Sequence, residues 1–156
     1  MARYQLAFSS TLATGAEQVR AVAFTPAGVN AELWPWLRMR FPGAPFTSLQ
    51  QVPVGVTLGR CWLLLFGVLP ADYDDLCFER IEPQGFVETS QLLSQRVWRH
   101  ERQIVGAAGS PQCTVHDRVS FTPRLGVPGF LSRLLIGRLF AWRHYRLRRR
   151  FGHAMP

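Results

Sequence analysis

The sequence lacks lysine entirely and contains little cysteine. All 18 basic residues are arginine, against 10 acidic residues, for a formal net charge of +8. The three cysteines, Cys61, Cys77 and Cys113, are an odd number without a CxxC spacing. That pattern argues against a disulfide framework, and a structural zinc site usually needs four Cys or His ligands at close spacing. We therefore expect free thiols, no metal site and no bound cofactor.

Long apolar runs are also missing. The longest, from Cys61 to Ala71, has 11 residues and is interrupted by Gly67 and Pro70, whereas a transmembrane helix needs about 20. The first six residues lack the apolar core of a signal peptide. The sequence therefore predicts a soluble protein located in the cytoplasm.

The sequence contains no Gly-x-Ser-x-Gly motif, no phosphate-binding loop and no dinucleotide fingerprint. Its 156 residues are 47 % hydrophobic and 18 % charged, which is enough apolar surface to form one buried core and too much for a disordered chain. We expect a single domain over residues 1–156. These absences favour a binding protein over an enzyme.

Short elements are predicted over the first four fifths of the chain. Residues 4–11 form a candidate strand, and the Thr-Gly-Ala-Glu segment at 14–17 has the form of a capping box that begins a helix. Thr25 before Pro26 predicts the start of a second short helix, which Pro35 ends. β-rich segments separated by turn residues then predict about six antiparallel strands, near residues 36–41, 54–69, 73–82, 86–93, 95–105 and 112–122.

After Pro123 the apolar period becomes helical and predicts one long helix over residues 128–151, ended by Gly152. Leucines and a tryptophan at three- and four-residue spacing are its expected packing side: Leu131, Leu134, Leu135, Leu139 and Trp142. An antiparallel sheet that buries one face needs a cover, and no other predicted element is long enough. The sequence therefore predicts an α+β fold, with a curved sheet of about seven strands wrapped on the C-terminal helix and a cavity favoured between them.

Four short motifs occur in order along the chain. They are Trp34-Pro-Trp-Leu-Arg-Met39, Trp98-Arg-His-Glu-Arg-Gln-Ile104, Asp117-Arg-Val-Ser-Phe-Thr-Pro123 and Phe140-Ala-Trp-Arg-His144. With the order of elements, they resemble the helix-grip fold of the SRPBCC superfamily, which includes START-related, Bet v 1-like and polyketide cyclase-like proteins, and within it a bacterial branch of ligand-binding type. Two positions depart from that branch: Arg102 stands where a second histidine is usual, and Ile104 replaces an aromatic residue.

The resemblance implies a function as well as a fold. It implies a hydrophobic small molecule, such as a lipid, an aromatic compound or a polyketide-like compound, held in a cavity between the sheet and the C-terminal helix. Some members of this fold are instead enzymes of cyclase, dehydratase or hydrolase type that use the same cavity. Because one fold supports many functions, the ligand is not specified by the resemblance.

Side-chain alternation places His100 and Arg102 on one face of their strand and Asp117 on one face of the next. If these strands pair, Asp117 opposes one of the two, either as a polar cluster that orients a ligand or as a structural ion pair. Arg143 on the long helix is expected to join Asp117, with the same two interpretations. His100 and Asp117 are the candidates for acid–base catalysis. The predicted ligand-binding residues are Trp36, Trp62, Phe66, Trp98, His100, Arg102, Asp117, Phe121, Phe140 and Arg143.

The positive charge is concentrated at the C-terminal end. Residues 1–129 carry 11 arginines and 10 acidic residues, whereas residues 130–156 carry seven arginines and no acidic residue. Arg133, Arg146, Arg149 and Arg150 are expected to face water. They suit either a solvated helix end or weak, salt-dependent contact with an anionic membrane surface or other polyanion. No specific nucleic-acid partner is predicted, and the chain is expected to be a monomer or a homodimer.

Overall fold

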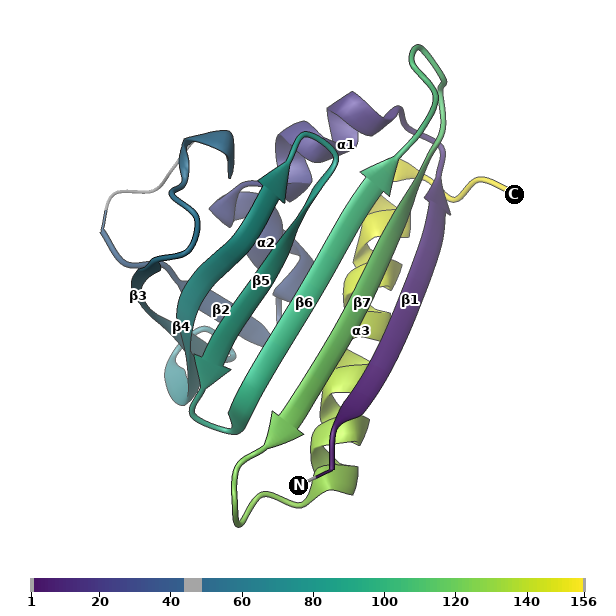
Figure 1. The fold of residues 1–156 in the computed structure, drawn as a ribbon. Helices are drawn as coiled ribbons and strands as arrows, with labels where there is room; N and C mark the ends of the chain where they lie inside the picture. The colour runs from purple at the N-terminus through teal and green to yellow at the C-terminus, as the bar shows by residue number, and fades with distance from the viewer. Residues whose placement is uncertain (1, 44–48, 156) are drawn as a thin grey trace.

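The computed structural model describes residues 2–43 and 49–155 (Figure 1). Its seven strands form one antiparallel sheet in the order β1-β7-β6-β5-β4-β3-β2, with α1, α2 and α3 on one side. The elements are β1 (Tyr4–Leu12), α1 (Ala16–Ala23), α2 (Pro26–Leu33), β2 (Leu37–Arg40), η1 (Leu49–Gln51), β3 (Thr57–Leu65), β4 (Leu69–Glu82), β5 (Gly85–Leu92), β6 (Gln95–Val105), β7 (Cys113–Pro123) and α3 (Gly129–Phe151). This architecture confirms the predicted helix-grip fold.

The pairing of β6 with β7 sets the register of the sheet centre. Arg102 lies opposite Asp117 and His100 lies opposite Val119, so the predicted hairpin forms. On the other side of β6, Gly85 begins β5 so close to Arg102 that a Cβ at this position would lie 2.1 Å from the Arg102 carbonyl oxygen. Only glycine permits that approach, which holds β5 firmly against β6.

The two short helices begin differently from each other. Thr25 caps α2 as predicted, because its hydroxyl accepts from the Gly28 amide at 3.0 Å. The predicted capping box at 14–17 is wrong: Gly15 is the N-cap of α1 and provides no side-chain bond. The Thr14 hydroxyl instead donates to the Phe151 carbonyl at 2.7 Å. The last carbonyls of a helix need donors, and the end of β1 lies beside the end of α3, so Thr14 caps α3.

The packing side of α3 differs from the leucine stripe predicted for it. The buried residues of α3 are Ser132, Phe140, Arg143, His144 and Leu147. Leu131, Leu134 and Leu135 are 39 %, 50 % and 58 % exposed. The helix is rotated so that polar residues face the sheet, because buried carboxylates there require partners. The spacing of apolar residues alone does not show that buried carboxylates need partners from this helix.

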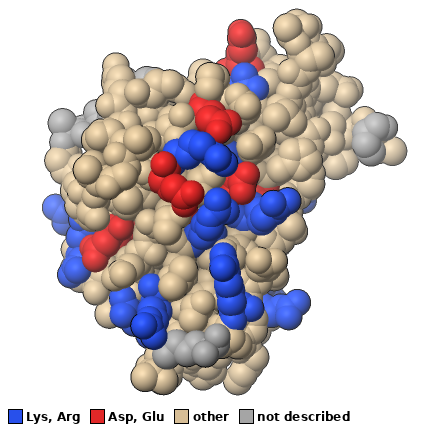
Figure 2. Space-filling view, in the orientation of Figure 1, with Lys and Arg blue, Asp and Glu red and all other residues tan. Residues whose placement is uncertain are grey.

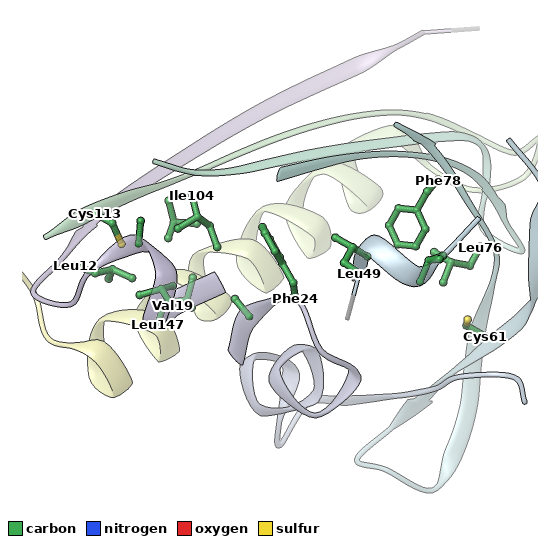
Figure 3. Close-up of a cluster of buried hydrophobic side chains, with 14 residues drawn as sticks. Leu12, Val19, Phe24, Leu49, Cys61, Leu76, Phe78, Ile104, Cys113 and Leu147 are labelled. Carbon is green, nitrogen blue, oxygen red and sulfur yellow. The ribbon is translucent and has the colours of Figure 1, made fainter. Parts of the chain in front are cut away.

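Two hydrophobic clusters join the helices to the sheet. The first extends from Leu12, Val19 and Leu147, where α1 and α3 meet the sheet, to Leu76 and Cys61 under β4 and β3 (Figure 3). The second lies beneath the N-terminal half of α3 and consists of Leu92, Trp98, Val119, Phe121 and Phe140. Between them the packed face of the sheet is polar, and this polar zone contains most of the candidate site.

The outer face of the sheet is a mixed charged surface. Figure 2 shows acidic and basic side chains interleaved over its middle. Arg60 pairs with Asp75 at 2.9 Å, and the Arg60 guanidinium lies 3.6 Å from the ring centroid of Tyr73, which also contacts Trp62. Exposed pairs of this kind contribute little stability. Within the described part of the chain, no helix has the length and apolar character needed to cross a membrane.

Candidate functional site

Asp117 on β7 is the centre of a buried polar cluster. Its Oδ1 accepts from His100 Nε2 at 2.7 Å and from Arg102 Nε at 2.8 Å. Its Oδ2 accepts from a second Arg102 nitrogen at 2.7 Å and from His144 Nε2 at 2.8 Å. Both oxygens therefore have two donors each, and the Asp117 side chain is fully buried.

A second carboxylate extends this cluster to α2. The Glu32 oxygens accept from Arg102 at 2.9 Å and from Arg143 Nε at 3.1 Å. Arg102 therefore bridges Asp117 to Glu32, and Arg143 closes the far side from α3. Two carboxylates and two guanidinium groups balance each other, which is the condition under which buried charges are tolerated. We call Glu32, Arg102, Asp117, Arg143 and His144, together with His100, the Asp117 cluster.

His144 connects the cluster to β1 and to the end of α3. Its Nδ1 lies 2.8 Å from the Ser10 hydroxyl oxygen, which also accepts from Arg148 at 2.8 Å. Since Asp117 only accepts, Nε2 carries the hydrogen of that bond, and the Ser10 proton is available to Nδ1. The sheet and the C-terminal half of α3 are thus joined by a continuous chain of hydrogen bonds.

The charges in the cluster shift two pKa values. Burial opposes ionisation of Asp117, but the Arg102 guanidinium, with His100, holds the pKa of that carboxyl well below its usual range. Burial also disfavours the charged form of Arg102, yet Asp117 and Glu32 outweigh this and raise its pKa. Both groups are therefore permanently charged near neutral pH, and neither is suited to exchange protons.

A second acidic pair lies beside the cluster, on β4 and β5. Asp74 and Glu88 are both buried. Ser90 donates to Glu88 Oε1 at 3.0 Å, and Glu88 Oε2 lies 3.9 Å from His100 Nδ1. Burial and the neighbouring Glu88 charge raise the pKa of Asp74, and its Oδ1 has no hydrogen-bond partner among the described residues. The two carboxyl groups therefore form a buried acidic site whose hydrogen-bonding capacity is not fully used among the described residues.

Exposed apolar side chains occupy another side of α3, from its N-terminal half to Trp142. The Trp36 ring lies 6.3 Å from Phe66 and 6.0 Å from Trp142 between centroids, and Trp142 donates to the Trp34 carbonyl at 3.1 Å. Leu135 and Leu131 precede Trp142 by seven and eleven residues, so they lie on the same side of the helix. Trp36, Phe66, Leu131, Leu135 and Trp142 are called the apolar margin below.

Phe66 stands out within the apolar margin because of its backbone. It begins the β3–β4 turn with a φ of 53°, which among the described residues other than glycine is the only positive value. A bulky aromatic residue in the left-handed region is uncommon and costs about 1–3 kcal/mol. The ring is nevertheless 52 % exposed, so burial of the ring does not explain why it is held there.

The structure places the predicted site residues in several different surroundings. His100, Arg102 and Asp117 meet as predicted, while Trp98, Phe121 and Phe140 are buried core. Trp36 and Phe66 lie at the apolar margin. Trp62 is on the outer face of β3, opposite buried Cys61, and therefore points away from α3. Arg143 does not reach Asp117 as predicted, because it pairs with Glu32 and the next residue, His144, takes that position.

The centre of the sheet–α3 interface is filled. Arg102, Asp117, Phe121 and Phe140 are fully buried there, so the cavity predicted between sheet and helix is not found at this place. Four residues of the site were missed from the sequence: Glu32, Asp74, Glu88 and His144. Glu32 had a visible signal, since it is the one charged residue of the otherwise uncharged α2 sequence.

Comparison with known proteins identifies the fold. A START superfamily protein from Mycobacterium smegmatis superposes with a TM-score of 0.69 at 13 % identity, over 94 % of this chain and 96 % of that chain. A protein from Chromobacterium violaceum superposes with a TM-score of 0.65 at 10 % identity, over 92 % of this chain and 96 % of that chain. A major latex-like protein from Panax ginseng superposes with a TM-score of 0.63 at 8 % identity, over 99 % of each chain. The chain therefore has the START- and Bet v 1-like fold.

The sequence itself matches one family. No curated protein matches it significantly. The chain belongs to the family described as a domain of unknown function (DUF8410), whose match covers residues 10–151.

Proposed function

We propose that this helix-grip protein binds a hydrophobic small molecule, a lipid or an aromatic or polyketide-like compound, against the apolar margin. The observation that carries the proposal is the exposure of Trp36 and Phe66, which lie beside Trp142, together with exposed leucines on the same side of α3. Trp36 is 47 % exposed and Phe66 is 52 % exposed. Aromatic rings bury large areas when a ligand covers them, so this surface gains most from an apolar ligand.

The rest of the interface provides a rigid support for such a site. The Asp117 cluster fixes α3 to the sheet through charged hydrogen bonds, which fixes the position of Trp142 one residue before Arg143. The hydrogen bond from Trp142 to the Trp34 carbonyl then orients the indole ring toward Trp36. Recognition surfaces held by such supporting contacts lose little order on binding.

The enzymatic alternative receives less support from the same geometry. A general base needs a free lone pair that faces the substrate. Asp117 has four donors on its two oxygens, and His100 is packed edge-on against the rings of Phe86 and Phe140 at 5.3 Å and 5.0 Å between centroids. We therefore assign His100 and Asp117 a structural role.

The full chain tests the proposal directly. Native mass spectrometry of the purified protein, followed by solvent extraction, identifies any co-purified apolar compound. A fluorescent fatty acid is then titrated into the wild type, Leu135→Glu and Leu134→Glu. Both leucines are exposed on α3, but Leu134 lies about 100° away from Leu135 around the helix.

We expect the fatty acid to bind the wild type and Leu134→Glu equally, and Leu135→Glu about tenfold more weakly or not at all, because a buried charge opposes apolar contact. Equal affinity in both variants would contradict the location of the site. Absence of binding by the wild type to a fatty acid, a polycyclic aromatic and a polyketide-like probe, with no co-purified compound, would contradict the function.

A further inference from the structure

A second feature lies farther along α3, toward its C-terminal end, beyond Trp142 of the apolar margin. Two hollows follow the seam between α2 and the C-terminal half of α3, which lie side by side behind the sheet in Figure 1. One has a volume of about 300 Å³ and the other about 410 Å³, and both are lined by Ala31 and Arg146. We call the two together the α2–α3 groove.

The rim of this groove is cationic. Arg146, Arg149 and Arg150 line the first hollow, and Arg38 with Arg146 lines the second. None of these four arginines forms an ion pair with a carboxylate of the described residues. The acidic residue that lines the groove, Glu32, is buried, and both its oxygens are bonded to Arg102 and Arg143. The groove therefore has positive charge without compensation.

Two of the guanidinium groups have contacts within the protein. Arg146 donates through Nε to the Ala31 carbonyl at 3.0 Å, which leaves its terminal nitrogens free over the groove. Arg149 lies over the Tyr145 ring and donates to its hydroxyl at 3.4 Å. Guanidinium groups with free terminal nitrogens bind the oxygens of phosphate in a bidentate manner, and fixing them beforehand reduces the entropy lost on binding.

The walls of the first hollow have the opposite character. Val22 and Ala23 from α1 and Leu147 and Phe151 from α3 line it beneath the arginine rim. An inorganic anion would use the rim alone. An apolar group joined to an anion would use rim and walls together, so the lining favours an amphiphile over a simple ion.

We propose that the α2–α3 groove binds the phosphate group of an amphiphile, with Arg146, Arg149 and Arg150 on the phosphate and the apolar walls on the adjoining carbon chain. None of the apolar-margin residues lines either hollow, so this proposal does not depend on the proposed function. The same chemistry comes from two sources, a free alkyl phosphate or a phospholipid headgroup at a membrane, and the test distinguishes them.

The test compares two double variants that remove the same charge from the same helix. Arg149→Gln/Arg150→Gln changes the groove, whereas Arg133→Gln/Arg138→Gln changes two exposed arginines outside it. Circular dichroism confirms that both fold. Calorimetry at constant ionic strength measures the binding of hexyl phosphate, inorganic phosphate and hexanol. Sedimentation measures the binding of the protein to phosphatidylcholine vesicles with and without phosphatidylglycerol.

We expect hexyl phosphate to bind the wild type and the control double variant alike, and the groove double variant about tenfold more weakly. Phosphate and hexanol are expected to bind more weakly than hexyl phosphate. If sedimentation with phosphatidylglycerol falls only in the groove double variant, the source is a membrane lipid; if sedimentation is unaffected while hexyl phosphate binding is lost, the source is a soluble ligand.

Three results would overturn the proposal. One is that neither hexyl phosphate nor anionic vesicles bind the wild type. Another is an equal loss of hexyl phosphate binding in both double variants, which would show that binding depends only on the net charge of the protein. The third is preference for duplex DNA over hexyl phosphate with the same dependence on both pairs of arginines, which would indicate a non-specific polyanion surface.

Discussion

The two halves of α3 contact the sheet in opposite ways. The C-terminal half, which α2 also covers, buries Arg143, His144 and Leu147 and donates to the Asp117 carboxylate through His144. The N-terminal half leaves Leu131 and Leu135 exposed, on the side of the helix that carries Trp142. The comparison teaches that stability and recognition are separated along one helix: the covered half fixes the fold, and the uncovered half is available to a ligand.

The largest expected effect is the removal of charge from the covered half. Asp117→Asn leaves Arg102 with one carboxylate, that of Glu32, instead of two. It also replaces one of the two accepting oxygens of Asp117 by an amide nitrogen, which donates. Breaking a buried charge network in this way costs about 3–5 kcal/mol. Urea denaturation of the full chain measures the change, with Asp75→Asn as the control, because the exposed Arg60–Asp75 pair contributes little to stability. Equal losses in the two variants would contradict the central role of Asp117.

The same substitution has a pH signature. Because the pKa of Asp117 is lowered in the folded state, its contribution is present above the ordinary carboxyl range, near pH 4, and is lost as the pH falls through the folded value. The wild type therefore loses stability on acidification more steeply than Asp117→Asn. The difference in free energy of unfolding between the two proteins is expected to narrow from pH 7 toward pH 3.

Truncation of one leucine in each half of α3 compares how much each half contributes to stability. Leu147→Ala removes a side chain that is 2 % exposed, and Leu135→Ala removes one that is 58 % exposed. The first is expected to cost about 2–5 kcal/mol and the second less than about 0.5 kcal/mol. Thermal and urea unfolding measure both. A cost above 1 kcal/mol for Leu135→Ala would show that the apolar margin is part of the core.

The effect expected from the acidic pair has the opposite sign. Asp74 holds a raised pKa, so the folded protein retains a proton that the unfolded chain releases above about pH 4, and the wild type loses stability as the pH rises. Asp74→Asn has no such proton to lose and is expected to be more stable than the wild type at pH 7. The difference in free energy of unfolding should shrink toward pH 4; a difference that is independent of pH would argue against a raised pKa of Asp74.

The sequence predicted most of the fold because local rules determined it. Turn residues such as Pro83 and Gly85 marked the strand ends, and β6 and β7 paired in the register that alternation indicated. The orientation of α3 was wrong, since four leucines with helical spacing outweighed Arg143 and His144 in any count of apolar residues. Partners such as Glu32, 70 residues before Arg102, depend on tertiary contacts that no local pattern contains.

The most direct measurement follows leucine methyl groups by NMR during titration of the full chain with a fatty acid or another apolar compound that it binds. We expect shifts for Leu131 and Leu135 at the apolar margin, with no shift for Leu134, which lies about 100° around the helix from Leu135, or for Leu147, which is buried in the covered half. Shifts confined to Leu134 or Leu147, or spread equally over all four leucines, would contradict binding at the uncovered half of α3.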